Sequence, residues 1–192
     1  MPPLLLASTS PYRRQLLERL GIAFACHDPE VDESAFHDSA KDPRQLAQVL
    51  AAAKADAISQ QQDHAVVIGC DQVCALDQEV LGKPGSAAAA VAQLERLQGR
   101  EHLLLTAVAL RHGATHRDFV ETTRMTMRPM PRHELQRYVA TDNPIDCAGS
   151  YKIEQAGIAL FDKIQGEDHT AIIGLPLMKL CHALRELGVD VP

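Results

Sequence analysis

Positive charge is in short supply in this sequence. Lys and Arg number 19 against 25 Asp and Glu among 192 residues, which gives a formal net charge of -6. A protein that binds nucleic acid or anionic lipid over a broad area needs a basic surface, so this composition argues against both partners. A polyanionic ligand must instead meet a local cluster of basic side chains.

The sequence also lacks a long apolar run. The run at residues 4–7 is too short for a signal peptide or a membrane span, and no basic region precedes it. The five cysteines are odd in number, include no C-x-x-C, and fit reduced thiols. We therefore expect a cytoplasmic protein without a membrane partner.

Several common catalytic motifs are missing as well. The sequence contains no G-x-S-x-G, no paired C-x-x-C and no G-x-G-x-x-G. The turn around Lys83 is not a P-loop, because Pro84 replaces the required Ser or Thr. His112 and His116 flank a predicted hairpin bend, so they do not share a helical face for zinc.

What the sequence does contain is an alternation of strand and helix patterns, typical of an α/β fold. Apolar or alternating runs predict strands, and spacing of three to four residues predicts helices. The predicted strands are 4–7, about 22–26, 65–76, 102–110, 115–127 and part of 147–157. The predicted helices are about 11–20, 43–59, 86–97, 131–138 and 175–187, and residues 27–45 form an acidic loop without regular structure. This order predicts one domain, residues 1–192, with a mixed sheet flanked by helices.

The first candidate site follows the strand at residues 4–7. Ser10 and the following proline predict a helix start, and Ser8, Arg13 and Arg14 surround it. A helix N-terminus with nearby guanidinium groups favours a phosphate. The alternative is a solvated arginine pair behind an ordinary Ser-Pro cap.

Acidic residues and one lysine form the second set of candidates. Asp71 is expected directly after a buried strand, where α/β proteins place ligand groups. Asp32 or Glu33 offers a second carboxylate for Mg²⁺, which prefers oxygen ligands, and Lys83 on its Gly-Pro turn offers a charge to a phosphate. The alternatives are an Asp71 that caps a turn, a solvated acidic loop and an exposed turn lysine.

Five segments taken together resemble the Maf family of nucleotide pyrophosphatases: "LLLASTSPYRR", "PEVDES", "IGCDQV", "GKP" and "CAGSYKIE". The resemblance covers nearly the whole chain. It implies a Maf/ITPase-like α/β fold with a twisted mixed sheet and two lobes around a central cleft. It also implies an enzyme, dimeric in many members, that uses a divalent metal, Mg²⁺ or Mn²⁺, to cut a nucleoside triphosphate into a monophosphate and diphosphate.

The resemblance also implies residue roles. It places Asp71 as the proton acceptor, and Glu33 and Asp71 at the metal. The side chains that it places around the phosphates are those of Ser8, Arg13, Arg14, Lys54 and Lys83.

Three further positions separate branches of the family. Gln72 and Glu154 look like the branch that hydrolyses 7-methyl-GTP as a house-cleaning reaction, and Tyr12 stands where that branch has a tryptophan. The physics agrees, because 7-methylguanine carries a positive charge that an aromatic ring attracts, and N–H donors that a carboxylate accepts. The alternative for Tyr12 is simple packing against Leu16.

Two rival functions stay open at this point. One is the same chemistry on dTTP and UTP, for which the family typically has Arg, Thr and Gln at the three branch positions. The other is a non-catalytic nucleotide-binding regulator of cell division. Glu33, Lys54, Asp71 and Lys83 together argue against a loss of catalysis.

Overall fold

The computed structural model describes residues 2–37 and 40–192, so Met1 and two residues of the expected acidic loop, Asp38 and Ser39, lie outside it. The chain divides into two compact units. Unit 1 comprises residues 1–72, 106–121 and 168–192, and unit 2 comprises residues 73–105 and 122–167. The prediction of a single domain stays a prediction.

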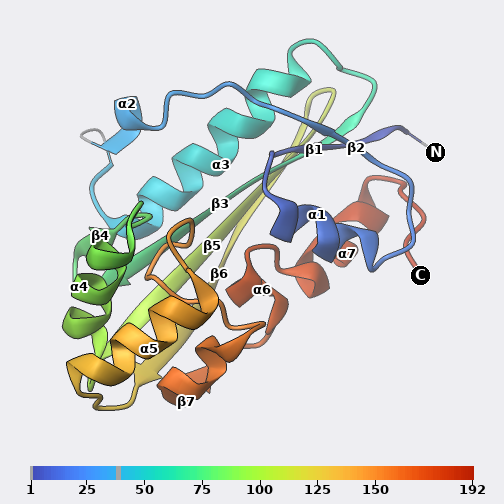
Figure 1. The fold of residues 1–192 in the computed structure, drawn as a ribbon. Coiled ribbons are helices and arrows are strands. Elements are labelled where there is room, and N and C mark those ends of the chain that lie inside the picture. Colours follow the sequence, from blue (N-terminus) through green and yellow to red (C-terminus); the bar gives the residue numbers. More distant parts are fainter. Residues whose placement is uncertain (1, 38–39) are drawn as a thin grey trace. The chain divides into compact units, whose positions relative to one another are not determined.

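Figure 1 shows the helices and strands of the described residues. In chain order they are β1 (Leu4–Ala7), α1 (Pro11–Glu18), β2 (Ala25–His27), α2 (Ser34–His37), α3 (Pro43–Ser59), β3 (Val66–Leu76), β4 (Glu79–Leu81), α4 (Ala87–Leu97), β5 (Glu101–His112), β6 (Thr115–Met127), α5 (Arg132–Asp142), the 3₁₀ helix η1 (Ala156–Leu160), β7 (Phe161–Gln165), α6 (Thr170–Ile173) and α7 (Leu177–Glu186).

Seven strands of the described residues form one mixed sheet that does not close. The strand order is β2-β1-β3-β5-β6-β7, and β4 pairs with β3 off this path. Strand β1 is parallel to both β2 and β3, whereas β4 and β7 are antiparallel to their neighbours β3 and β6. The α/β class and the mixed sheet expected from the sequence are therefore confirmed.

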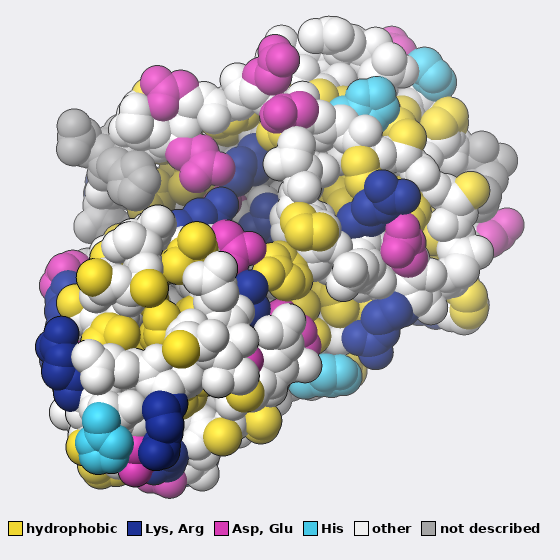
Figure 2. Space-filling view, in the orientation of Figure 1, with side chains coloured by type: hydrophobic (Ala, Val, Ile, Leu, Met, Phe, Trp, Pro, Cys, Tyr) yellow, Lys and Arg dark blue, Asp and Glu magenta, His cyan; other side chains and the backbone are white. Residues whose placement is uncertain are grey.

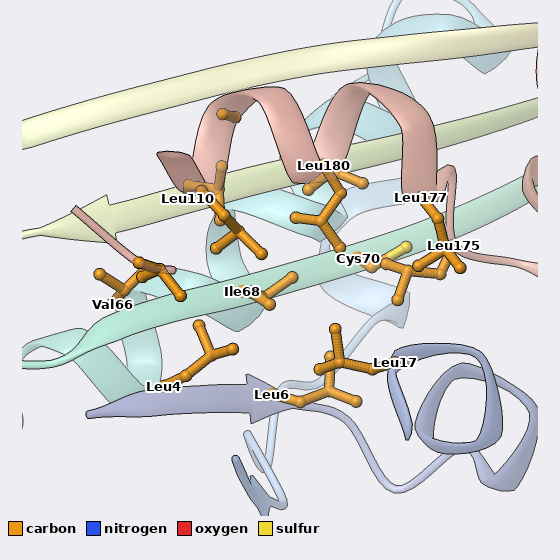
Figure 3. Packing of buried hydrophobic residues seen from close by; sticks show 14 of the residues in the cluster. Leu4, Leu6, Leu17, Val66, Ile68, Cys70, Leu110, Leu175, Leu177 and Leu180 are labelled. Carbon is orange, nitrogen blue, oxygen red and sulfur yellow. The ribbon is translucent and has the colours of Figure 1, made fainter. Parts of the chain in front are cut away.

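The core of unit 1 lies between strands β1 and β3 and helix α7. Leu6 and Ile68 lie on neighbouring strands and are fully buried, and Leu180 and Leu184 of α7 are equally buried in the same cluster (Figure 3). Helix α1 adds Leu17. Full burial of each such side chain contributes about 1.5–3 kcal/mol relative to exposure, so these contacts fix where β1, β3 and α1 lie.

Unit 2 has its own core around an aromatic cluster. The ring centroids of His102 and Tyr151 lie 5.6 Å apart, and those of Tyr151 and Phe161 lie 4.8 Å apart in an edge-on arrangement. His102 Nε2 and the Tyr151 hydroxyl share a hydrogen bond of 2.9 Å. Helix α4 begins at the cap Ser86, whose hydroxyl accepts from the N–H of Ala89, and it lies beside α5 (Figure 1).

Most predicted elements occur close to their expected bounds. Helix α3 spans the expected residues 43–59, because Asp42 caps it by accepting from the N–H of Gln45. The hairpin of β5 and β6 also occurs, with its bend at Gly113, whose φ is 53°.

Some predictions were wrong in detail. The acidic loop contains the short helix α2, which follows an Asp32 side chain that accepts from the N–H and hydroxyl of Ser34. Residues 147–157 contain no strand, because the chain folds back at Gly157, whose N–H donates to Lys152 O at 3.1 Å. The strands β4 and β7 and the helix α6 were not expected at their positions. Helix α7 is shorter than residues 175–187, since Pro176 stands before its first turn.

On the face drawn in Figure 2, the Lys and Arg side chains form no broad basic patch. Lys and Arg side chains lie there in small groups between acidic, apolar and other side chains. Among the described residues, none of the helices is both long enough and apolar enough to span a membrane.

Candidate active site

A buried ammonium group joins two carboxylates in unit 1. Lys54 Nζ lies 2.6 Å from Asp71 Oδ1 and 2.6 Å from Glu33 Oε1. Lys54 and Asp71 are each only 7% exposed, whereas the Glu33 side chain is 49% exposed. We call these three residues the carboxylate–lysine centre.

The centre exists because α3 packs unusually close to β3. A Cβ atom at Gly69 would lie 2.2 Å from the carbonyl oxygen of Ala51 on α3, so only glycine fits there. Asp71 follows two residues later on the same face of the strand, and Lys54 follows Ala51 by about one helical turn. The glycine contact therefore brings a helix lysine onto a strand carboxylate.

Asp71 lies inside β3, within the strand predicted at residues 65–76, and not after the end of a strand as its expected role as a ligand group assumed. The strand continues because Val73, Cys74 and Leu76 are buried and pair or pack beyond it. A strand interior tolerates the Asp71 carboxylate because the Lys54 ammonium neutralises it there.

Ser8 and Arg13 form a second group at the end of β1. The Ser8 hydroxyl accepts from the N–H of Ser10 at 3.1 Å and from Arg13 Nη1 at 3.4 Å. Arg13 Nε donates to the carbonyl oxygen of Gly174 at 3.2 Å. Ser10 caps α1 as expected, by accepting from the Arg13 N–H at 3.4 Å. The Arg13 guanidinium is thus held in place beside the start of α1.

Cys70 connects the two groups. This buried thiol donates to the same Gly174 carbonyl oxygen that binds Arg13, at 3.0 Å, and Figure 3 shows it beside Leu175 and Leu177. Burial raises the pKa of the Cys70 thiol; the Arg13 charge lowers it, Asp71 raises it and Lys54 lowers it. Arg13 and Cys70 thus share the Gly174 carbonyl oxygen, and Cys70 directly precedes Asp71 on β3.

Arg14 is placed differently from Arg13. Its guanidinium is 64% exposed and pairs with Glu18 one turn along α1, at 2.9 Å. This hydrogen bond raises the pKa of Arg14. Exposed ion pairs of this kind contribute at most about 1 kcal/mol, so the Arg14 side chain exchanges partners at little cost.

Tyr12 and Gln72 also belong to unit 1. Tyr12 is half-buried on the first turn of α1, whereas Leu16 below it is fully buried. Gln72 is half-buried on β3, and its amide nitrogen donates to Thr106 Oγ1 at 2.9 Å and to the carbonyl oxygen of Ala171 at 2.8 Å.

Lys83 and Glu154 belong to unit 2, and both are exposed. The turn of Lys83 is fixed by hydrogen bonds on either side, from Gln93 to Gly82 O at 2.8 Å and from the Gly85 N–H to Ile145 O at 2.9 Å.

Glu154 follows an anchored segment of unit 2. The N–H of Lys152 donates to the hydroxyl of Tyr138 at 2.9 Å, and Lys152 Nζ pairs with Asp146 at 3.4 Å. Both predicted residues of this unit, Lys83 and Glu154, thus stand on defined loops.

Sequence reasoning missed the role of residues 168–178, which contain α6 and the start of α7. The buried Asp168 carboxylate accepts from the N–H groups of Thr170 and Met178, and the Thr170 hydroxyl accepts from the N–H of Leu177. These bonds hold the carbonyl groups that receive Arg13 and Gln72. The available signal was the pair of polar residues two apart, Asp168 and Thr170, ahead of a proline, which is typical of a capping turn.

The carboxylate–lysine centre fits a divalent cation. Two carboxylates meet one ammonium there, so one negative charge is in excess, and carboxylate oxygens are the ligands that Mg²⁺ and Mn²⁺ prefer. No group of three or more His, Cys, Asp or Glu in the described part of the chain is arranged to hold a metal. Mg²⁺ often takes only one or two carboxylates and completes its shell with substrate phosphates and water, as this donor set requires.

Asp32 does not share this role. Its carboxylate accepts from Ser34, and these hydrogen bonds lower the pKa of Asp32. Of the two carboxylates considered from the sequence, Glu33 is the one on Lys54.

The chain is similar to known proteins over nearly its whole length. The family described as "Maf-like protein" matches residues 3–187. Proteins named "7-methyl-GTP pyrophosphatase" are similar over the full length of both chains: the one from Pseudomonas syringae pv. syringae is 44% identical over 194 residues, and one from Xanthomonas oryzae pv. oryzae is 46% identical over 192 residues. The match covers the segments that carry Ser8, Arg13, Lys54 and Asp71. The chain therefore belongs to the Maf family.

Proposed function

We propose that this protein is a nucleoside triphosphate pyrophosphatase that hydrolyses 7-methyl-GTP to 7-methyl-GMP and diphosphate. The observation that carries the proposal is the carboxylate–lysine centre, in which Lys54 holds Glu33 and Asp71 at 2.6 Å each. Full-length relatives at 44% and 46% identity that are named for this activity support the choice of nucleotide.

The centre has the groups that phosphoanhydride hydrolysis needs. An ammonium has three N–H donors, and two of them on Lys54 are directed to carboxylates, which leaves one for a phosphate oxygen. Arg13, held by Ser8 and Gly174, offers planar donors for a second phosphate. Lys83 stays a predicted phosphate ligand.

We propose that Asp71 orients the attacking water and takes up its proton, and that water attacks the α-phosphorus while diphosphate leaves. Glu33 and Asp71 would hold Mg²⁺ or Mn²⁺. Such an ion acidifies its bound water and neutralises phosphate charge. Asp71 and Lys54 are buried, so their positions are set before substrate arrives, which favours catalysis by preorganised charge.

Base selection is assigned to Tyr12, Gln72 and Glu154. A Tyr ring attracts the positively charged 7-methylguanine by stacking and cation–π contact, worth about 0.5–2 kcal/mol. The Glu154 carboxylate is exposed and accepts from N–H donors.

The Arg14 guanidinium, exposed on α1, is available to the triphosphate after release from Glu18. The cytoplasmic location and the homodimer stay predictions.

The test is a substrate panel with the purified full chain and Mg²⁺. The nucleotides are 7-methyl-GTP, GTP, UTP and dTTP, and both diphosphate and the nucleoside monophosphate are measured. We expect the kcat/KM for 7-methyl-GTP to exceed that for GTP by about 2- to 30-fold, the factor that the cation–π energy gives. A preference for UTP or dTTP would instead indicate the rival pyrophosphatase, and nucleotide binding without diphosphate release would indicate the non-catalytic regulator.

A further inference from the structure

The hydroxyl of Thr106 is one of the acceptors of the Gln72 side-chain amide. Thr106 is on β5, only 1% exposed, and its hydroxyl donates to the carbonyl oxygen of Ala171 at 2.9 Å. The amide nitrogen of Gln72 donates to Thr106 Oγ1 at 2.9 Å, to Ala171 O at 2.8 Å and to Ile172 O at 3.1 Å. These four residues all belong to unit 1.

This arrangement permits one orientation of the Gln72 amide. The carbonyl oxygens of Ala171 and Ile172 only accept hydrogen bonds, so they must face the NH₂ group of Gln72 and not its oxygen. Because the Thr106 hydroxyl gives its proton to Ala171, its lone pair also faces the NH₂ group. Both N–H bonds of the amide are therefore used on the protein side.

The amide oxygen of Gln72 is consequently the group that is presented outward. Within residues 2–37 and 40–192 it accepts no hydrogen bond, and solvent reaches it. A group that only accepts favours a ligand edge with N–H donors or positive charge over an edge with lone pairs. 7-Methylguanine has both a pair of N–H donor groups and a positive charge. Uracil and thymine have one N–H between two carbonyl oxygens.

We propose that Thr106 is a positioning residue for base selection: with the carbonyl groups of Ala171 and Ile172 on α6, it fixes Gln72 as an outward-facing acceptor. This inference rests on the proposed function, in which Gln72 contacts the base. It adds a residue that touches no substrate and acts only through Gln72.

The chain offers a matched pair of threonines for the test. Thr106→Val keeps the shape and removes the hydroxyl that binds Gln72, and Thr106→Ser restores it. The control is Thr123→Val in unit 2, because Thr123 is also 1% exposed and its hydroxyl has no partner in the described part of the chain. Thermal unfolding of all variants shows whether the fold is kept.

The first measurement follows exchange of the Gln72 side-chain NH₂ with solvent by NMR, with the exposed Gln61 as the internal reference. We expect Gln72 to exchange at least about tenfold more slowly than Gln61 in the wild type and in Thr106→Ser and Thr123→Val, because both of its N–H bonds are occupied. Thr106→Val should lose most of this protection. Equal exchange of Gln72 and Gln61 in the wild type would overturn the proposal.

The second measurement is kinetic. We expect Thr106→Val to raise KM for 7-methyl-GTP about tenfold, the size of one lost buried hydrogen bond, with kcat changed less than about twofold and with selectivity over UTP reduced. Unchanged KM and selectivity in Thr106→Val would refute the inference while leaving the pyrophosphatase intact. A wild type that does not hydrolyse 7-methyl-GTP would refute the proposed function, and the exchange experiment would still decide the role of Thr106.

Discussion

At the scale of single residues, Lys54 is the cation that pairs with both candidate carboxylates, Glu33 and Asp71. It is buried with Asp71 at 2.6 Å and reaches the exposed Glu33 at the same distance. Removing one partner of a buried ion pair is far more costly than the pair is stabilising, since the remaining charge is left in a poor solvent. A variant of the same shape at position 71 avoids most of this cost, because Lys54 keeps a hydrogen-bond acceptor there and still pairs with Glu33.

Asp71→Asn is the direct test of the proton acceptor. The amide oxygen still accepts from Lys54, so we expect the fold to be kept, while turnover of 7-methyl-GTP falls by about 10²- to 10⁴-fold because the amide is no base. Steady-state kinetics, with thermal unfolding as the control, measures both quantities. Turnover equal to that of the wild type would remove Asp71 from the mechanism.

His102 predicts how stability depends on pH. Burial lowers the pKa of His102 from 6.5 to about 4, and its Nδ1 has no hydrogen-bond partner in the described residues. Between pH 6.5 and about pH 4, His102 is therefore protonated in the unfolded chain and neutral in the folded chain. This contribution to stability is fully present above pH 6.5 and is lost as the pH falls towards 4.

We expect the free energy of unfolding of the wild type to fall by about 2 kcal/mol between pH 7 and pH 5 through His102 alone. His102→Gln should lose that part of the pH dependence. Urea unfolding of both proteins at the two pH values measures the difference. Parallel pH profiles in the two proteins would show that His102 titrates normally in the folded chain.

At the scale of elements, the contact between α3 and β3 determines the site. The backbone of β3 touches α3 at Gly69, where a Cβ would lie 2.2 Å from Ala51 O and 2.6 Å from Ala55 N. Lys54 lies between these two helix residues. Any widening of this contact moves Lys54 away from Asp71.

Gly69→Ala should therefore reduce stability and activity together. Overpacking of this kind costs about 1–3 kcal/mol, and the displacement of α3 should weaken the Lys54–Asp71 contact and lower kcat. Gly82→Ala is the control for stability, since nothing lies within 4 Å of its Cβ and its backbone is not left-handed. We expect that control to change the free energy of unfolding by less than about 0.5 kcal/mol. A Gly69→Ala protein as stable and active as the wild type would contradict the account of the helix position.

The elements also show what sequence patterns reveal. Helix α3 and the hairpin of β5 and β6 are long and periodic, so local pattern and packing agree and their bounds are predictable. Strand β4 and helix α6 have three and four residues, too few for a period to be recognised. The ion pair of Lys54 and Asp71 was not predictable, because the two residues lie 17 apart in the sequence, one on a helix and the other on a strand.

The candidate site divides in the same way. Side chains with distinctive chemistry, such as Asp71 and Arg13, are visible in a sequence. Thr106 was not visible, because one of its partners is the backbone carbonyl oxygen of Ala171. Its other partner is the Gln72 amide, and the orientation of that amide is known only from the structure. Backbone groups are the same in every residue and give no sequence pattern. The residues that support a site through backbone hydrogen bonds can therefore be identified only from the structure.

At the scale of the whole molecule, the chain is acidic and its proposed substrate is a polyanion. With a formal net charge of -6, the proposed binding relies on local cations such as Arg13 and Lys54 and on a divalent metal. The proposed hydrolysis therefore requires the metal.

We expect EDTA to abolish hydrolysis of 7-methyl-GTP and added Mg²⁺ or Mn²⁺ to restore it. Glu33→Gln should raise the metal concentration needed for half-maximal activity by at least about tenfold, because one charged ligand is lost. Metal titration of the diphosphate-release rate measures this. Full activity in EDTA would remove the metal from the proposal.

The central claim is that the chain directs water onto the α-phosphorus of 7-methyl-GTP. Hydrolysis in ¹⁸O-labelled water, followed by mass spectrometry of both products, tests it most directly. The account predicts one ¹⁸O atom in 7-methyl-GMP and none in diphosphate. Label in the diphosphate, or no hydrolysis of 7-methyl-GTP with Mg²⁺ present, would contradict it.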